Sequence, residues 1–211
     1  LIKGLQKYFD DRPKLAKPHF TAEPTADGEI GQMIRRILDN GGVDESGHKL
    51  TREELQTLFI RERLQHRRGE GQLLKCWPIV SDRDWESTLA YYMSYGGAPK
   101  WVVDEHERIF REAGREFFVS DLTLVIDVPA EVAYARQHAM GKTLDFFETD
   151  LLKIRRRVEA YRSLLKVLAG LVPNLPRNIV LINGGRSPDE VFADVLAHVR
   201  EIFLRKADIK I

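Results

Sequence analysis

The sequence LTLVIDV at residues 122–128 decides the fold class, because, apart from Asp127, it is a continuous run of apolar and β-branched side chains. IVLI at residues 179–182 has the same character, and such runs are typical of strands covered on both faces of a parallel sheet. Shorter runs at 19–21 and 79–81 predict two further strands. Helical patterns alternate with these strands, so the sequence predicts an α/β fold with a parallel sheet and crossover helices. We expect the helices at 27–38, 51–68, 85–93, 100–113, 130–139, 146–169 and 187–205.

One helix boundary has a clear chemical signal. Ser187 is followed by Pro188 and, three residues after the serine, by Glu190, which together form a capping box with proline at the first helical position. We find no repeat, linker or low-complexity run, so residues 1–211 are expected to form a single domain.

Composition excludes several classes of protein. The 211 residues are 43% apolar and 31% charged, as in ordinary globular domains. The single cysteine, Cys76, cannot form an internal disulfide, which favours a reduced, cytoplasmic protein. Thirty-three basic residues balance 32 acidic ones, so we expect no nucleic-acid partner. We also expect no membrane span, because no window of about 18 apolar residues exists.

Charged and glycine-rich segments follow the four predicted strands. Glu23 comes after the first, Asp82 and Arg83 after the second, Asp127 after the third and the turn 183–186 after the fourth. Ligands of parallel α/β sheets bind beyond the carboxyl ends of the strands. Arginine suits phosphate, and carboxylate suits Mg²⁺, so this edge predicts a site for a phosphorylated ligand with a metal ion.

Two other signals are weaker. Residues 141–143 read GKT, like the end of a phosphate-binding loop, but Arg136 occupies the position where that loop requires glycine. We therefore interpret residues 136–148 as a basic lid. The six histidines show no metal-ligand spacing, and no Ser-His-Asp or Cys-His arrangement is evident.

Taken in order, several segments resemble the thymidylate kinase family, whose members phosphorylate dTMP with ATP. The resemblance implies a three-layer P-loop fold of the nucleoside-monophosphate-kinase type, with Mg²⁺ as cofactor, ATP as co-substrate and commonly a homodimer. The segments that carry it are AEPTA at 22–26, FIRERLQH at 59–66, DRDWESTLAYY at 82–92, LVIDVPAEVA at 124–133, LDFFE at 144–148 and RVEAY at 157–161.

The resemblance also implies roles for the substrate-binding residues. Phe59 would stack on thymine, although it also fits the core of an amphipathic helix. Arg63 and Arg83 would hold the monophosphate, and Thr88 would bond to the base edge. Tyr91 would lie beside the sugar, with core packing as the alternative.

The remaining implied roles concern phosphates and metal. Asp82 would position Mg²⁺ or the attacking phosphate, and Glu23 would lie near the sugar and phosphates. Arg136 and Lys142 in the lid, with Arg186, would act on the ATP side, although the first two also fit a solvated surface.

The first strand and phosphate-binding loop of the family precede a helix that resembles residues 1–9. We therefore expect roughly 15 further residues upstream of Leu1.

Three departures from the family pattern leave alternatives open. Ala22 replaces an arginine, Asp84 replaces a tyrosine or histidine, and Phe146 replaces an arginine in the lid. All three reduce the expected positive charge near phosphate. Two alternatives to dTMP phosphorylation therefore stay open. The chain could be a nucleotide-binding relative without catalysis, or a kinase of the same fold that acts on another nucleotide or nucleoside.

Overall fold

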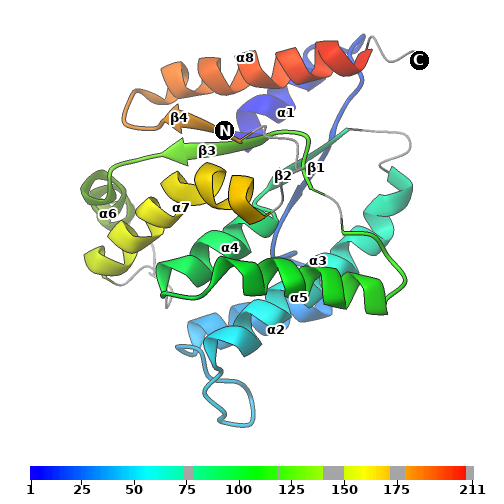
Figure 1. Cartoon of the computed structure of the whole chain (residues 1–211). Coiled ribbons are helices and arrows are strands. Elements are labelled where there is room, and N and C mark those ends of the chain that lie inside the picture. Colours follow the sequence, from blue (N-terminus) through cyan, green and yellow to red (C-terminus); the bar gives the residue numbers. More distant parts are fainter. Residues whose placement is uncertain (74–77, 118, 140–149, 172–178, 208–211) are drawn as a thin grey trace.

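The computed structural model describes residues 1–73, 78–117, 119–139, 150–171 and 179–207. Helices and strands alternate through these residues (Figure 1). In chain order they are α1 (Ile2–Asp10), β1 (His19–Ala22), α2 (Glu29–Asp39), α3 (Arg52–Leu73), β2 (Ile79–Asp82), α4 (Trp85–Ser94), α5 (Pro99–Glu112), β3 (Thr123–Asp127), α6 (Ala130–Ala139), α7 (Leu151–Leu171), β4 (Ile179–Asn183) and α8 (Pro188–Ala207).

The four strands form two parallel pairs. β1 pairs with β2 from His19 opposite Ile79, and β3 pairs with β4 from Thr123 opposite Ile179. All four strands expected from the sequence are present, and their predicted parallel direction is confirmed. The carboxyl ends of β1 and β2 are adjacent, with Ala22 opposite Asp82.

Helices cover the strands on both faces (Figure 1). On one side, Leu5 and Phe9 of α1 and the apolar stripe of α8 pack in a cluster that also includes Leu124 and Ile126 of β3. On the other side, β3 contributes Val125 to a cluster formed with α4, α5 and α7. Successive residues of a strand point to opposite faces, so the apolar run of β3 is explained by burial on both.

The helix ends agree with the sequence signals, with two differences. At the start of α8, the Ser187 Oγ donates to Glu190 Oε2 (2.5 Å) and accepts from the Glu190 N–H (3.4 Å), which confirms the capping box. Helix α3 ends at Leu73 rather than near 68. Helix α7 begins at Leu151, and residues 146–149, expected to begin it, lie outside the described residues.

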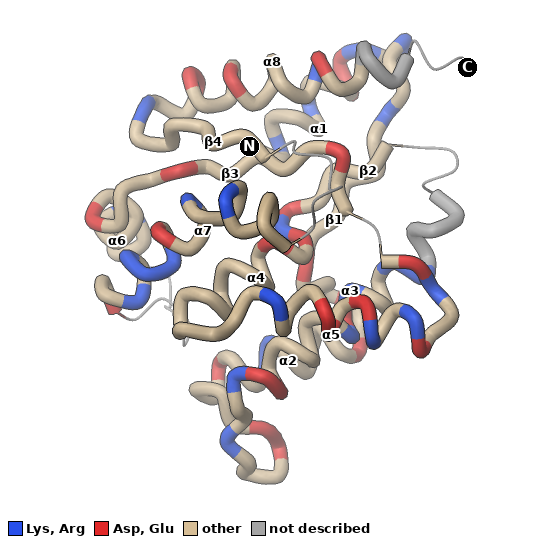
Figure 2. The backbone as a smooth tube through the Cα atoms, viewed as in Figure 1, with Lys and Arg blue, Asp and Glu red and all other residues tan. Residues whose placement is uncertain are grey.

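Basic and acidic residues are interspersed along the chain (Figure 2). None of the helices in the described part of the chain is both long and apolar enough to cross a membrane.

Candidate functional site

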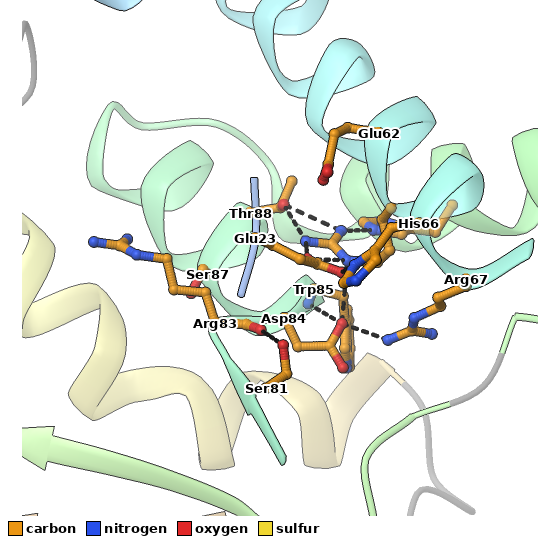
Figure 3. Close-up of polar contacts among 12 residues, drawn as sticks. Glu23, Glu62, His66, Arg67, Ser81, Arg83, Asp84, Trp85, Ser87 and Thr88 are labelled. Atoms are coloured by element: carbon orange, nitrogen blue, oxygen red, sulfur yellow. Dashed lines mark hydrogen bonds and ion pairs between the residues drawn. The ribbon is translucent and has the colours of Figure 1, made fainter. Parts of the chain in front are cut away.

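A cluster of buried charged and polar side chains lies behind the carboxyl ends of β1 and β2 (Figure 3). We call it the buried charge cluster. Its members are Glu23 after β1, Arg63 and Arg67 of α3, Asp84 and Glu86 at the start of α4, and His106 of α5.

Arg63 is the centre of this cluster, with only 2% of its side chain exposed. Its Nε donates to Glu23 Oε2 (2.8 Å), and its Nη2 lies 2.6 Å from the same oxygen. Its Nη1 donates to His106 Nε2 (2.7 Å) and, at 3.3 Å, to Thr88 Oγ1. Each guanidinium nitrogen therefore already has a partner within the protein.

The pKa values in the cluster follow from burial and pairing. Burial by itself would raise the pKa of Glu23, but Arg63 and the hydrogen bond from His66 outweigh it and leave that pKa lowered. Burial and the nearby Arg63 hold the pKa of His106 well below its ordinary value. The neutral His106 ring accepts from Arg63 at Nε2, while Nδ1 donates to the Val102 carbonyl (2.7 Å). Glu23 and Arg63 are thus a charged pair next to a neutral imidazole.

Asp84 lies at the junction of three elements. Its Oδ1 accepts from the Trp85 N–H (2.7 Å), which caps α4, and pairs with Arg63 Nε (3.1 Å) and with Arg67. Its Oδ2 accepts from Ser120 Oγ (2.9 Å) in the loop before β3. The expectation that Asp84 adds negative charge near phosphate therefore needs correction, because two arginines neutralise it inside the protein.

Glu86 is the remaining acid of the cluster. It accepts a hydrogen bond from Thr123 Oγ1 (2.7 Å) at the start of β3. Burial first, and then the neighbouring Asp84 carboxylate, raise the pKa of Glu86 to about 7. This side chain therefore changes charge near neutral pH.

Arg83 differs from Arg63 in its surroundings. It directly follows β2, and its side chain is exposed. Its backbone φ is 73°, in the left-handed region, and its Nη1 donates to the Tyr91 hydroxyl (3.1 Å). Arg157 of α7 donates to the same hydroxyl (3.2 Å). Arg83 is exposed and Arg157 is half-buried, and we call Arg83, Tyr91 and Arg157 the arginine–tyrosine group. Two cations thus converge on one neutral oxygen atom.

Phe59 of α3 shares an apolar cluster with one member of this group. It is half-buried and packs in an apolar cluster with Tyr91 and Tyr95. Thr88 is buried on the same helix as Tyr91. The structure therefore brings Phe59, Thr88, Tyr91 and Arg83 to one region between α3 and α4.

The acids expected near metal and sugar are neighbours in the sheet. Asp82 is exposed at the end of β2, and its carbonyl accepts from the Glu23 N–H (3.0 Å). Mg²⁺ is usually bound by one or two carboxylates together with phosphate oxygens, so an exposed Asp82 fits such an ion. Within the described ranges, no group of three or more His, Cys, Asp and Glu side chains is placed to hold a metal by itself.

The residues expected on the ATP side meet at the end of β4. Arg136 Nη1 donates to the Gly184 carbonyl (2.9 Å), and Arg186 pairs with Asp194. A Cβ at Gly184 would lie 2.6 Å from Val128, so only glycine fits this close approach to the chain leaving β3. Lys142 lies outside the described residues.

Three residues at the site were missed by the sequence reasoning as functional candidates. Arg157 lies in a segment that resembles the family, and this was the only signal for it. Arg67 and His106 had none, because their partners are distant in sequence.

This arrangement suits the binding of a phosphorylated ligand. The exposed Arg83 and the half-buried Arg157 can meet phosphate oxygens, the Tyr91 ring lies beside them, and the Asp82 carboxylate stands at a strand end. Phosphoryl transfer depends mainly on positioning and charge stabilisation rather than on a protein nucleophile.

Comparison with known proteins gives a consistent answer. The family model described as thymidylate kinase matches residues 6–195. The thymidylate kinase of Dinoroseobacter shibae is 32% identical over 185 residues, which cover 86% of this chain and 81% of that protein. The thymidylate kinase of Nostoc punctiforme is 29% identical over 179 residues, covering 84% of this chain and 78% of that protein. The chain belongs to the thymidylate kinase family.

Proposed function

We propose that this chain transfers the γ-phosphate of ATP to dTMP and releases dTDP and ADP. The family membership supports this reaction, and both compared relatives carry the name thymidylate kinase. The single observation that carries the proposal for the site is the convergence of Arg83 and Arg157 on the Tyr91 hydroxyl. An anionic phosphate is a stronger acceptor for two guanidinium groups than a neutral phenol.

In this proposal, the phosphate of dTMP binds to Arg83 and Arg157, and thymine stacks on Phe59. The contact between Phe59 and the cluster that includes Tyr91 supports it, because one nucleotide could then reach both groups. The Tyr91 ring would lie beside the sugar. Thr88 would meet the base edge.

Arg63 has a different place in the proposal. Its donors are engaged with Glu23, His106 and Thr88, so binding phosphate would require it to exchange a partner. We propose that its main role is to order Glu23 and Thr88 behind the nucleotide. Direct binding of phosphate by Arg63 stays a prediction.

Asp82 would hold Mg²⁺, and the ion, when bound, would neutralise charge on the transferred phosphate. Arg136 and Arg186, together with Lys142, would act on the ATP side. The contact of Arg136 with the turn after β4 supports a common location for the first two.

We also propose that both strand pairs belong to one sheet of a three-layer P-loop domain. Side chains of β1 and β2 (Phe20, Val80) and of β3 and β4 (Leu124, Val180) pack in the same apolar cluster, which supports this view.

The phosphate-binding loop would precede α1, and the codons upstream of Leu1 would test it. A homodimer, as the family resemblance implies, and a place in the cytoplasm, as the single cysteine favours, complete the proposal. Light scattering would measure the oligomeric state.

The reaction is tested by measuring dTDP formation from ATP and dTMP in the full-length protein, beside dUMP, dCMP and thymidine as alternative acceptors. We expect the highest kcat/KM with dTMP. Faster turnover with another acceptor would favour the same fold acting on a different substrate. Nucleotide binding by calorimetry without any turnover would favour a relative that only binds. One argument for a relative without catalysis was the negative charge of Asp84 near phosphate. That argument is weaker, because Arg63 and Arg67 neutralise Asp84.

A further inference from the structure

The turn between β2 and α4 contains an unusual backbone conformation. Arg83 is the only non-glycine residue with positive φ among the described residues, at 73°. The left-handed region is unfavourable for a residue with a Cβ and persists only where surrounding contacts impose it. Something in the structure must therefore hold this turn.

The next residue, Asp84, supplies that restraint. Its extended backbone (φ −158°, ψ −163°) begins α4, and its carboxylate has partners on three sides. Oδ1 accepts from the Trp85 N–H and pairs with Arg63 and Arg67 of α3, and Oδ2 accepts from Ser120. Only 16% of the Asp84 side chain is exposed. The turn is thus anchored to α3, to α4 and to the loop before β3.

The other side of the turn is also held. Ser81 Oγ donates to the Arg83 carbonyl (2.6 Å), two residues further on. The carbonyl of residue 83 is therefore held by Ser81, and the residue that follows it is held by the Asp84 side chain.

The consequence is visible in the directions of the two neighbouring side chains. Figure 3 shows Asp84 pointing toward Arg67, while the Arg83 side chain extends away from the cluster. The Arg83 guanidinium reaches the Tyr91 hydroxyl at 3.1 Å and lies 5.6 Å from the centre of its ring. The same turn therefore directs the Asp84 side chain into the cluster and the Arg83 side chain away from it.

We propose that Asp84 is a positioning residue, whose buried carboxylate holds residue 83 in the left-handed conformation and thereby directs Arg83 toward the phosphate of the acceptor nucleotide. Arg67 is part of this device because it neutralises the carboxylate inside the protein. The inference rests on the proposed function in one respect, namely that Arg83 binds the acceptor phosphate.

The test compares Asp84→Ser with the parent protein by calorimetric titration of dTMP and of ATP. Serine still caps a helix well but is too short to reach Arg67 and Ser120. We expect dTMP to bind at least tenfold more weakly, with ATP affinity within twofold of the parent. Asp44→Ser is the matched control, because Asp44 also bonds to nearby backbone N–H groups, in an exposed loop. It is expected to change neither affinity.

The double variant shows whether Asp84 acts through Arg83. If it does, Asp84→Ser combined with Arg83→Ala binds dTMP no more weakly than Arg83→Ala does. A loss equal to the sum of the two single losses would overturn the proposal, as would unchanged dTMP binding in Asp84→Ser. If Asp84→Ser does not fold, Asp84→Asn takes its place in the cycle, since asparagine also caps but carries no charge.

A second measurement is independent of the reaction. Arg83→Gly should melt at a higher temperature than Arg83→Ala, because only glycine relaxes at a φ of 73°. The difference should shrink when Asp84→Ser is added. An unchanged difference would overturn the restraint by Asp84. If Arg83→Ala leaves dTMP binding intact, the phosphate role of Arg83 fails, while this melting comparison still decides whether Asp84 holds the turn.

Discussion

Arg63 and Arg83 are the two arginines that the family resemblance places on the same phosphate, yet the structure puts them in opposite surroundings. Arg63 is enclosed by Glu23, Asp84 and His106, whereas Arg83 is exposed and contacts Tyr91.

The comparison shows that the role of an arginine depends on where its charge is balanced. A buried guanidinium must be matched inside the protein, since losing one partner of a buried pair leaves an unpaired charge. An exposed guanidinium is solvated and contributes little to stability, so it is available to a ligand. The buried charge cluster should therefore respond to substitution in stability, apart from Asp84, which also acts through Arg83. Arg83 in the arginine–tyrosine group should respond in activity.

The largest expected effect is on stability, from Arg63→Met. This change leaves Glu23 buried without its main cationic partner and should lower the free energy of unfolding by about 3 to 5 kcal/mol. Chemical denaturation at pH 7 measures it. Arg108→Met is the matched control, because Arg108 also pairs with two carboxylates, Glu105 and Glu112, but is 41% exposed. Its loss should change the free energy of unfolding little, because exposed ion pairs are solvated and contribute little to stability. Equal losses would contradict the distinction between the two regions.

Arg83→Ala should instead lower activity and leave stability nearly unchanged. Removing a cation that meets charge developing on phosphate should lower kcat by about 10² to 10³-fold, with little change in melting temperature. Steady-state assays with dTMP and thermal melts measure both. Arg115→Ala removes an exposed arginine after α5 and serves as the control for net charge. Wild-type turnover in Arg83→Ala would show that Arg83 does not bind the phosphate.

Glu86→Gln tests the buried charge cluster through pH. The folded pKa of about 7 lies above the ordinary 4.5, so the folded state binds this proton more tightly than the unfolded state does. The wild type should therefore lose stability relative to Glu86→Gln as pH rises from about 4.5 to 7, by about 3 kcal/mol at most. Glutamine can still accept from Thr123. Urea unfolding of both proteins at several pH values measures the difference. A difference that does not vary with pH would mean that Glu86 is ionised throughout.

Phe59→Ala gives the smallest expected effect and concerns a side chain between the two regions. Loss of one base stack should weaken dTMP binding by about 1 to 3 kcal/mol, with ATP binding nearly unchanged, as calorimetric titration would show. Leu58→Ala is the control, since Leu58 packs in the same apolar cluster. That change should lower the melting temperature but keep dTMP affinity. Equal losses for dTMP and ATP in Phe59→Ala, with a large fall in melting temperature, would assign Phe59 to the core.

The sequence by itself determined the elements and the family. The apolar runs that became β3 and β4, the helical periodicities between them and the capping box at Ser187 are local patterns, and local patterns are written in consecutive residues. The ordered motifs were also enough to indicate thymidylate kinase, and the same motifs contain Arg83 and Tyr91.

Only the tertiary structure decided which charges are balanced inside the protein and which face outward. Arg63 meets Glu23 across 40 positions of sequence, Arg67 meets Asp84 across 17, and Arg157 reaches Tyr91 across 66. No periodicity encodes such pairs, because they depend on how α3, α4 and α7 pack together. An arginine in a motif therefore predicts a cation near the site. Its burial, set by that packing, decides whether the cation supports the fold or meets the substrate.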